Sequence, residues 1–208
     1  MKTYKIFLIR HGLTIANEKG LYIGKTDYGL SAKGIQQLLE LKTRYGYPKP
    51  DLLFTSPLAR CRQTLQILYP DREAQVVEGL AECDFGDWEG QSIAQLQQRE
   101  DFIQWVRGNK FSRIPNGEDP RAFQQRVLTA FEQVVQTILL SGKSEALICT
   151  HGGVISLILL AYGLPKLPMH QTAAGPGGGF VLRITPSLWS KQPVAEILGR
   201  YPEPETAE

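Results

Sequence analysis

The sequence lacks the features that mark several large classes of protein. It has only three cysteines, Cys61, Cys83 and Cys149, and no C-x-x-C pair, so neither a disulfide framework nor a structural zinc site is expected. We interpret each cysteine as a small buried hydrophobe beside a functional residue, in preference to a redox group. A bilayer-spanning helix needs about 20 apolar residues, and the richest apolar run, Val154 to Ala161, is much shorter. The run Ile6 to Ile9 is too short for the core of a signal peptide, so a cytoplasmic location is expected.

An excess of charge of one sign is also missing. The 23 basic and 21 acidic side chains give a formal net charge of +2, which supports neither nucleic acid nor a membrane as the main partner. Glycine and proline are too few and too scattered for a low-complexity chain. With 208 residues, 42% of them hydrophobic, the chain is long enough to bury a sizeable core. We therefore expect one domain over residues 1–208, with a polar, proline-broken and mobile tail at residues 201–208.

Short apolar runs alternate with helical patterns along the chain. Runs typical of buried strands occur at residues 4–9, 51–55, 145–149, 180–184 and 194–198, with a weaker candidate at 75–78. Helices are expected from the N-cap Ser31 to about Tyr45, from Ser56-Pro57 to about Leu68, and along the apolar repeat from Phe123 to Ile138. In the first of these helices, the inner side is expected to hold Ile35, Leu38, Leu39 and Leu41. The alternation predicts an α/β fold, a three-layer sandwich with a largely parallel sheet and helices on both faces.

Arginine, histidine and glutamate side chains follow the first four predicted strands. Arg10-His11-Gly12 comes directly after residues 4–9, and Arg60 lies just beyond residues 51–55. Glu82 follows the weak strand candidate, and His151-Gly152-Gly153 follows residues 145–149. Because the carboxyl ends of parallel strands meet at one edge of a sheet, we expect these side chains to converge there.

The chemistry of this set points to phosphate. Arginine binds a phosphate through two oxygens at once, and a helix that begins after a glycine turn adds N–H donors. A histidine among arginines stays neutral, so that a ring nitrogen keeps a lone pair for attack on phosphorus. A carboxylic acid can then protonate the leaving oxygen and later activate water. The sequence therefore predicts a phosphoryl-transfer site.

Five segments resemble, in order, the motifs of the phosphoglycerate-mutase-like histidine phosphatases. RHGLTIAN at residues 10–17 is similar to R-H-G-[EQ]-[ST]-x-x-N, and GKTDYGLSAKG at residues 24–34 is similar to G-x-x-D-x-x-L-[ST]-x-x-G. TSPLARCRQT at residues 55–64, LAECDFGDWEG at residues 80–90 and THGG at residues 150–153 resemble the remaining motifs. Leu13 departs from the signature, which often has glutamate or glutamine there. The departure bears on substrate contacts more than on the mechanism.

The resemblance implies a role for each matched position. His11 is expected to be the phosphorylated nucleophile, and Glu82 the proton donor and then the base, with Asp84 as the second candidate. The phosphate is expected to be held by Arg10, Arg60 and His151, with Asn17 and the Gly152 backbone assisting. Further substrate contacts are expected from Thr14, Ile23 and Gly24. No metal and no organic cofactor is implied, and the expected partner is a small phosphomonoester; a homodimer stays an open alternative.

Several other features have more ordinary interpretations. Trp88, Phe85 and Phe123 are interpreted as core residues, and the glycines at 175–179 as a turn before a strand. His170 is interpreted as a loop residue, with a pocket contribution as the alternative. Residues 115–119 are expected to cap the long helix.

Three functions are compatible with these residues. A phosphatase is favoured, because the chain is compact between Glu82 and His151 and because its FGDWEG run resembles the phosphatase branch, which includes α-ribazole and broad-specificity phosphatases. A phosphoglycerate mutase is the alternative. A catalytically silent interaction module of the same fold is the third. The substrate depends on a lid expected near Tyr22, Ile23 and residues 100–120.

Overall fold

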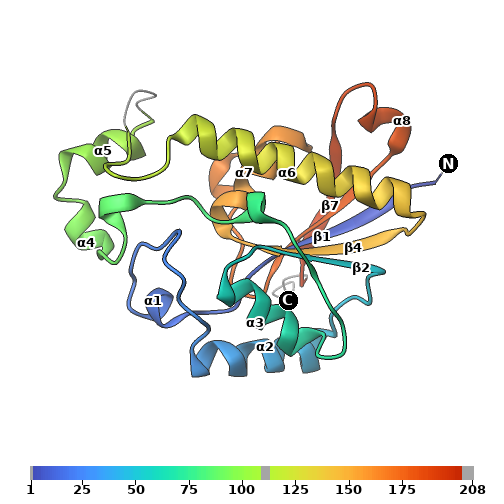
Figure 1. The fold of residues 1–208 in the computed structure, drawn as a ribbon, viewed down its shortest axis with the longest axis horizontal. Helices are drawn as coiled ribbons and strands as arrows, with labels where there is room; N and C mark the ends of the chain where they lie inside the picture. Colours follow the sequence, from blue (N-terminus) through green and yellow to red (C-terminus); the bar gives the residue numbers. More distant parts are fainter. Residues whose placement is uncertain (1, 109–112, 203–208) are drawn as a thin grey trace, which may run out of the picture.

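The computed structural model describes residues 2–108 and 113–202, and within them a seven-stranded sheet forms the centre of the molecule (Figure 1). The strands are β1 (Tyr4–Arg10), β2 (Leu52–Thr55), β3 (Gln75–Val76), β4 (Glu145–Thr150), β5 (Gly163–Leu164), β6 (Gly179–Ile184) and β7 (Ala195–Tyr201). They lie in the order β3-β2-β4-β1-β6-β7-β5. The pairs β3/β2, β2/β4, β4/β1 and β7/β5 are parallel, whereas β6 runs antiparallel to both β1 and β7. The largely parallel sheet predicted from the sequence is confirmed.

Helices cover both faces of this sheet, because successive side chains of a strand point to opposite faces. On one face, Ile6 and Leu8 of β1 pack in a cluster with α6 (Pro120–Ser141) and α7 (Gly152–Tyr162). On the other face, Phe7 and Ile9 pack in a second cluster with α3 (Ala59–Leu68). Figure 1 shows α2 (Ala32–Tyr45) beside α3 on this second side. The three-layer α/β prediction is confirmed.

The long helices begin and end where the sequence has capping residues. Ser31 accepts a hydrogen bond from the backbone N–H of Gly34 at the start of α2. At the start of α6, the side chain of Asp119 accepts hydrogen bonds from the backbone N–H groups of Arg121 and Ala122, and Pro120 occupies the first helical position. Gly142, with φ +74, ends α6 in a left-handed conformation that favours glycine.

Three local predictions were wrong. Ser56 is not the N-cap of α3, which begins at Ala59 after Leu58; its hydroxyl accepts from the backbone N–H of Leu58 at 3.3 Å and is also hydrogen-bonded to a buried histidine at 2.7 Å. Ile35 and Leu39 are 40% and 49% exposed, because α2 packs against the body of the protein through a narrow strip around Gly34 and Leu38. Tyr201 is the last residue of β7 and packs edge-on against Phe7, so it does not start a tail. The rest of that expected tail, from residue 203, lies outside the described residues.

A smaller aromatic subdomain lies beyond the carboxyl ends of the parallel strands. It contains α4 (Ile93–Leu96), α5 (Glu100–Val106) and the 3-10 turn η2 (Gly86–Trp88), at the left of Figure 1. Its buried cluster is Cys83, Trp88, Leu96, Phe102 and Ile114. The short helix α1 (Ile15–Glu18) follows β1 at the same end of the molecule. Residues 109–112 of the expected lid fall outside the described part of the chain.

The antiparallel strand β6 carries the chain away from this end. It runs from a glycine-rich turn beside Arg10 to Ile184, which pairs with Tyr4. The connection through α8 (Pro186–Trp189) to β7 therefore lies at the opposite ends of the strands, next to the N-terminus (Figure 1). In the described residues, every helix is too short or too polar to span a bilayer.

Candidate active site

The residues predicted from four strand ends meet around one cavity. The cavity has a volume of about 480 Å³, and its lining includes Arg10, His11, Arg60 and Glu82, which we call its floor. After β4 the lining residues are Gly152 and Gly153, whereas His151 is fully buried behind them and is not in the lining. Gly152, Thr14, Asn17 and Ile23 also line it. Gly24 does not, so its expected substrate contact is not supported by its position.

The hydrogen bonding of His11 determines which ring nitrogen is free. Its Nδ1 lies 2.7 Å from the carbonyl oxygen of Gly12, and because a carbonyl only accepts, Nδ1 must carry the proton. Nε2 of the neutral ring then keeps its lone pair. Burial, together with the positive charges of Arg60 and Arg10, lowers the pKa of His11 to about 3. His11 is therefore neutral at any ordinary pH and offers Nε2 as a nucleophile.

The guanidinium of Arg10 lies beside this ring with part of its hydrogen-bonding capacity unused. Nη1 donates to the carbonyl of Ala174 at 3.0 Å. Its Nε is buried and has no hydrogen-bond partner among the described residues. A buried donor left in this way is costly unless a ligand satisfies it. An anion bound over His11 can supply that acceptor.

Arg60 is buried and held by backbone carbonyls on its outer side. Its Nη1 donates to Thr26 at 3.0 Å and its Nη2 to Gly24 at 2.6 Å. A glycine is needed at position 24, because a Cβ there would lie 1.7 Å from the carbonyl oxygen of Cys83. The loop is tied in turn to Glu89, whose carboxylate accepts hydrogen bonds from the backbone N–H groups of residues 25 and 26. Gly24 thus helps to position Arg60 without lining the cavity.

His151 lies next to His11, with the ring centroids 5.3 Å apart. Its Nδ1 accepts from Nε of Arg60 at 3.2 Å, because an arginine can only donate. Its Nε2 therefore carries the proton and donates to the hydroxyl of Ser56 at 2.7 Å. Burial and the charge of Arg60 lower the pKa of His151. Both nitrogens are engaged by the protein, so its expected contact with a phosphate stays a prediction. That contact would require one of these hydrogen bonds to be exchanged.

Glu82 reaches the cavity from an irregular segment after the 3-10 turn η1 (Glu78–Leu80). Its Oε1 accepts from the backbone N–H of Cys83, and its Oε2 accepts from Gly153 in the first turn of α7, both at 3.0 Å. Burial raises the pKa of Glu82, although these hydrogen bonds and the two arginines act in the other direction. A raised pKa favours a carboxyl group that holds a proton for donation.

The rival acid is held elsewhere. The carboxylate of Asp84 accepts from Nζ of Lys25 at 3.2 Å and from the backbone N–H of Gly86 at 3.0 Å. Asp84 is not among the residues that line the cavity. The geometry therefore favours Glu82.

Asn17 and Thr14 form the capping box of α1. Thr14 donates to Oδ1 of Asn17 through its backbone N–H at 3.2 Å and through its hydroxyl at 3.0 Å. Because Oδ1 is used in this way, Nδ2 is the group of Asn17 that can donate to a ligand.

The outer wall of the cavity is apolar and partly aromatic. Its residues are Leu21, Tyr22, Ile23, Phe85, Trp105, Ile114, Phe123, Leu157, Leu160 and Met169. Phe85 and Phe123, interpreted from the sequence as core, also face this cavity, whereas Trp88 is fully buried. His170 is exposed, and its neighbour Met169 is the residue that reaches the cavity.

Sequence reasoning missed Ser56 and most of this wall. The position of Ser56, directly after a predicted strand in the Arg60 motif, was an available signal for a site residue. The wall has no such signal, because it combines segments that are far apart in the chain. Within the described residues there is no group of three or more His, Cys, Asp or Glu side chains that could hold a metal ion.

Comparisons with known proteins agree with this geometry. A family model, the histidine phosphatase superfamily (branch 1), matches residues 6–194. The adenosylcobalamin/alpha-ribazole phosphatase of Escherichia coli K12 is 33% identical over 170 residues, which cover 79% of this chain and 82% of that protein. The crystal structure of the alpha-ribazole phosphatase of Shigella flexneri has 31% identity and a TM-score of 0.75 over 93% of this chain and 94% of that one. An Escherichia fergusonii protein named "Probable phosphoglycerate mutase GpmB" is 30% identical over 166 residues, 77% of this chain and 76% of that protein.

Proposed function

The chain belongs to the histidine phosphatase superfamily (branch 1), and we propose that it hydrolyses small phosphomonoesters through a covalent phosphohistidine on His11. The observation that carries the proposal is the geometry of His11, a buried ring whose Nδ1 is held by the carbonyl of Gly12 and whose Nε2 has no hydrogen-bond partner among the described residues. Membership of the histidine phosphatase superfamily and the relatives named as phosphatases support phosphatase activity.

The first half of the reaction forms the phosphoenzyme. Nε2 of His11 attacks phosphorus, and the bond from phosphorus to the ester oxygen breaks. Protonated Glu82 donates its proton to that oxygen, so that the alcohol leaves as a neutral molecule. Arg10 and Arg60 stabilise the negative charge on the transferring group.

The second half returns the enzyme to its starting state. Ionised Glu82 takes a proton from a water molecule, and the water oxygen attacks the phosphorus of the phosphohistidine. The phosphorus–nitrogen bond breaks, phosphate leaves, and His11 is again neutral. Glu82 again holds a proton, and neither a metal nor an organic cofactor takes part in the proposed steps.

The apolar wall supports a phosphatase over a mutase. Among the described residues that line the cavity, the cations are Arg10 and Arg60, and both lie on its floor. A phosphoglycerate carries a carboxylate as well as a phosphate, and this wall offers it no further cation. An ester with an apolar or aromatic alcohol, such as the alpha-ribazole phosphate named for the relatives, suits it better. We propose a small-molecule substrate of this class and a cytoplasmic enzyme that needs no nucleic-acid or membrane partner.

Trapping the intermediate tests the proposal. The protein is quenched during turnover of a radiolabelled aryl phosphate, and the label is expected on His11, stable in base and lost in acid, as is usual for phosphohistidine. The variant His11→Ala should carry no label and release no phosphate, with an unchanged circular dichroism spectrum. Turnover by that variant would contradict the assignment of the nucleophile.

The same protein preparation separates the alternatives. Phosphate release from an aryl ester without interconversion of 2- and 3-phosphoglycerate is expected. Interconversion as the faster reaction would favour the mutase. No labelling of the wild-type protein by any phosphomonoester tried would favour the silent interaction module.

A further inference from the structure

The segment that carries Glu82 has little regular structure of its own. It follows η1 and includes residues 81–84, whose backbone groups are not paired within a strand or an α-helix. Its position must therefore be set by side chains from other elements. Because a displacement of about 1 Å can cost a catalytic group a factor of about 100, the groups that hold this segment bear on the reaction.

One arginine of α6 holds the segment from behind. Nη1 of Arg126 donates to the carbonyls of Gly79 at 3.0 Å and Ala81 at 2.8 Å, and Nη2 donates to the carbonyl of Glu82 at 2.9 Å. Nε and Nη2 also bond to the two carboxylate oxygens of Glu118, at 2.6 and 2.9 Å. These five hydrogen bonds use all five N–H groups that a guanidinium has.

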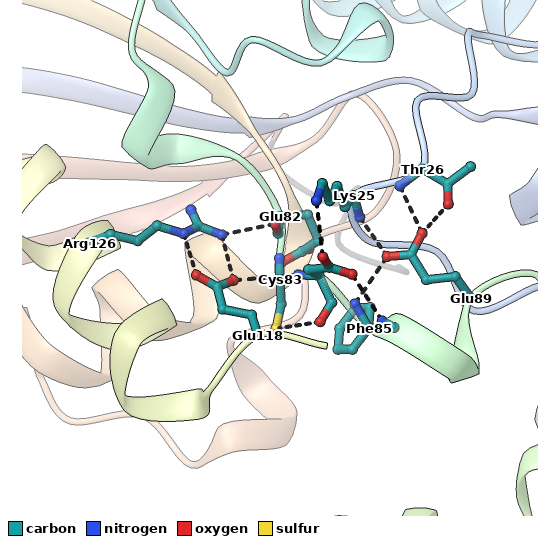
Figure 2. A network of polar contacts seen from close by, with 10 residues as sticks. Lys25, Thr26, Glu82, Cys83, Phe85, Glu89, Glu118 and Arg126 are labelled. Carbon is teal, nitrogen blue, oxygen red and sulfur yellow. Dashed lines mark hydrogen bonds and ion pairs between the residues drawn. The ribbon is translucent and has the colours of Figure 1, made fainter. Parts of the chain in front are cut away.

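Glu118 completes the support on the far side of Glu82. Its backbone N–H donates to the carbonyl of Asp84 at 2.8 Å, and its Oε2 accepts from the backbone N–H of Asp84 at 3.4 Å. Figure 2 shows Arg126 and Glu118 joined to each other and to the backbone of the segment. The backbone carbonyls of residues 79, 81 and 82 thus accept hydrogen bonds from the guanidinium of Arg126, and that of residue 84 accepts one from the backbone N–H of Glu118.

This ion pair lies outside the cavity. Neither Arg126 nor Glu118 is among the described residues that line it. Arg126 instead lines a separate groove between α6 and the edge strand β3. Arg126 also lies over the ring of Phe123, which lines the cavity, at 5.0 Å from the ring centroid. An effect through Phe123 would act on substrate binding for both esters, whereas an effect through Glu82 depends on the leaving group.

We propose that the Arg126–Glu118 pair positions Glu82 for proton transfer to the leaving oxygen. The inference rests on the proposed function, in which Glu82 is the proton donor. Arg126 and Glu118 are positioning residues, and their loss slows esters whose alcohol needs a proton to leave. An activated aryl ester, whose phenol leaves without one, is affected much less.

The first test compares two substrates and two arginine variants. Arg126→Met removes all five donors and keeps an unbranched side chain. Arg183→Met is the matched control, because it removes the exposed Arg183–Glu196 pair on the β6–β7 hairpin, away from the cavity. For Arg126→Met, we expect kcat/KM, which reports the steps up to formation of the phosphohistidine, to fall about tenfold more on a primary alkyl phosphate than on p-nitrophenyl phosphate. The control should leave the ratio of the two kcat/KM values unchanged, and an equal fall in kcat/KM on both substrates for Arg126→Met would overturn the proposal.

A double-mutant cycle separates positioning from a general loss of structure. In a Glu82→Gln background no proton is donated, so Arg126→Met should cause no further change in the substrate ratio. A loss that adds fully to that of Glu82→Gln would overturn the proposal. If Glu82→Gln itself leaves the ratio unchanged, the proposed role of Glu82 fails. If Glu82→Gln changes the substrate ratio but Arg126→Met does not, the positioning role of the Arg126–Glu118 pair is refuted, whereas the role of Glu82 as proton donor still stands.

A milder variant decides the matter if Arg126→Met does not fold. Glu118→Gln keeps a side-chain oxygen for Arg126 and removes the charge that orients it. We expect the same change in substrate ratio with a smaller size, about threefold. Glu118→Gln with a wild-type ratio, or with equal slowing of both substrates, would overturn the proposal.

Discussion

The close approach of Gly153 to the carboxyl group of Glu82 predicts the effect of a single added methyl group. In Gly153→Ala, the new Cβ would lie 2.5 Å from Oε1 and 3.2 Å from Cδ of Glu82. To restore an ordinary contact the carboxyl group must move by roughly 0.7 Å, because carbon and oxygen atoms that are not bonded rarely approach closer than about 3.2 Å. A displacement of this size is expected to lower kcat/KM on an alkyl phosphate about 100-fold. The fall in kcat/KM on p-nitrophenyl phosphate should be at least tenfold smaller.

The free energy of unfolding of this variant should fall by no more than about 2.5 kcal/mol. Ala replaces Gly in the first turn of α7, which favours the helix by about 0.5–1 kcal/mol, and the crowding opposes it by about 1–3 kcal/mol. The matched control is Gly199→Ala in β7, where an added Cβ meets nothing within 4 Å. Steady-state kinetics on both esters and urea unfolding of both variants provide the measurements. A wild-type kcat/KM of Gly153→Ala on the alkyl ester would refute the placement of Glu82 against α7.

Two further predictions concern the histidines. Between pH 6.5 and about 3 the unfolded chain binds a proton at His11 that the folded chain does not, so the free energy of unfolding should fall as the pH is lowered. Urea unfolding should show the wild type losing about 2 kcal/mol more than His11→Gln between pH 7.5 and 5; equal losses would contradict the low pKa. Ser56→Ala leaves the buried Nε2–H of His151 without its acceptor and should lower the free energy of unfolding by about 1–3 kcal/mol. An unchanged urea midpoint would show that this hydrogen bond contributes nothing.

Local patterns predicted the sheet and the positions of its functional side chains well. The apolar runs at residues 4–9 and 145–149 are strands β1 and β4, and the histidines that follow them, His11 and His151, lie side by side with His11 in the cavity lining. This succeeded because strand burial is visible in a run of a few residues, and because parallel strands share their carboxyl edge.

Predictions that needed long-range contacts were the ones that failed. Ser56 has the sequence of a helix cap, but its hydroxyl is used by a histidine 95 residues away. Leu39 fits the spacing of apolar residues along a helix, but α2 contacts the rest of the protein only around Gly34 and Leu38, and Leu39 stays exposed. The aromatic wall joins Tyr22, Phe85 and Trp105 through ring contacts that no single segment reveals.

The reversed direction of β6 has a practical consequence for attaching this protein to a support. The exposed residues 190–193, between α8 and β7, and the start of β1 lie at the opposite end of the molecule from α4 and α5 (Figure 1), and none of them lines the cavity. A linker joined at either place points away from the cavity mouth. Beads or electrodes coupled through these positions would leave the route for incoming esters and departing phosphate unobstructed.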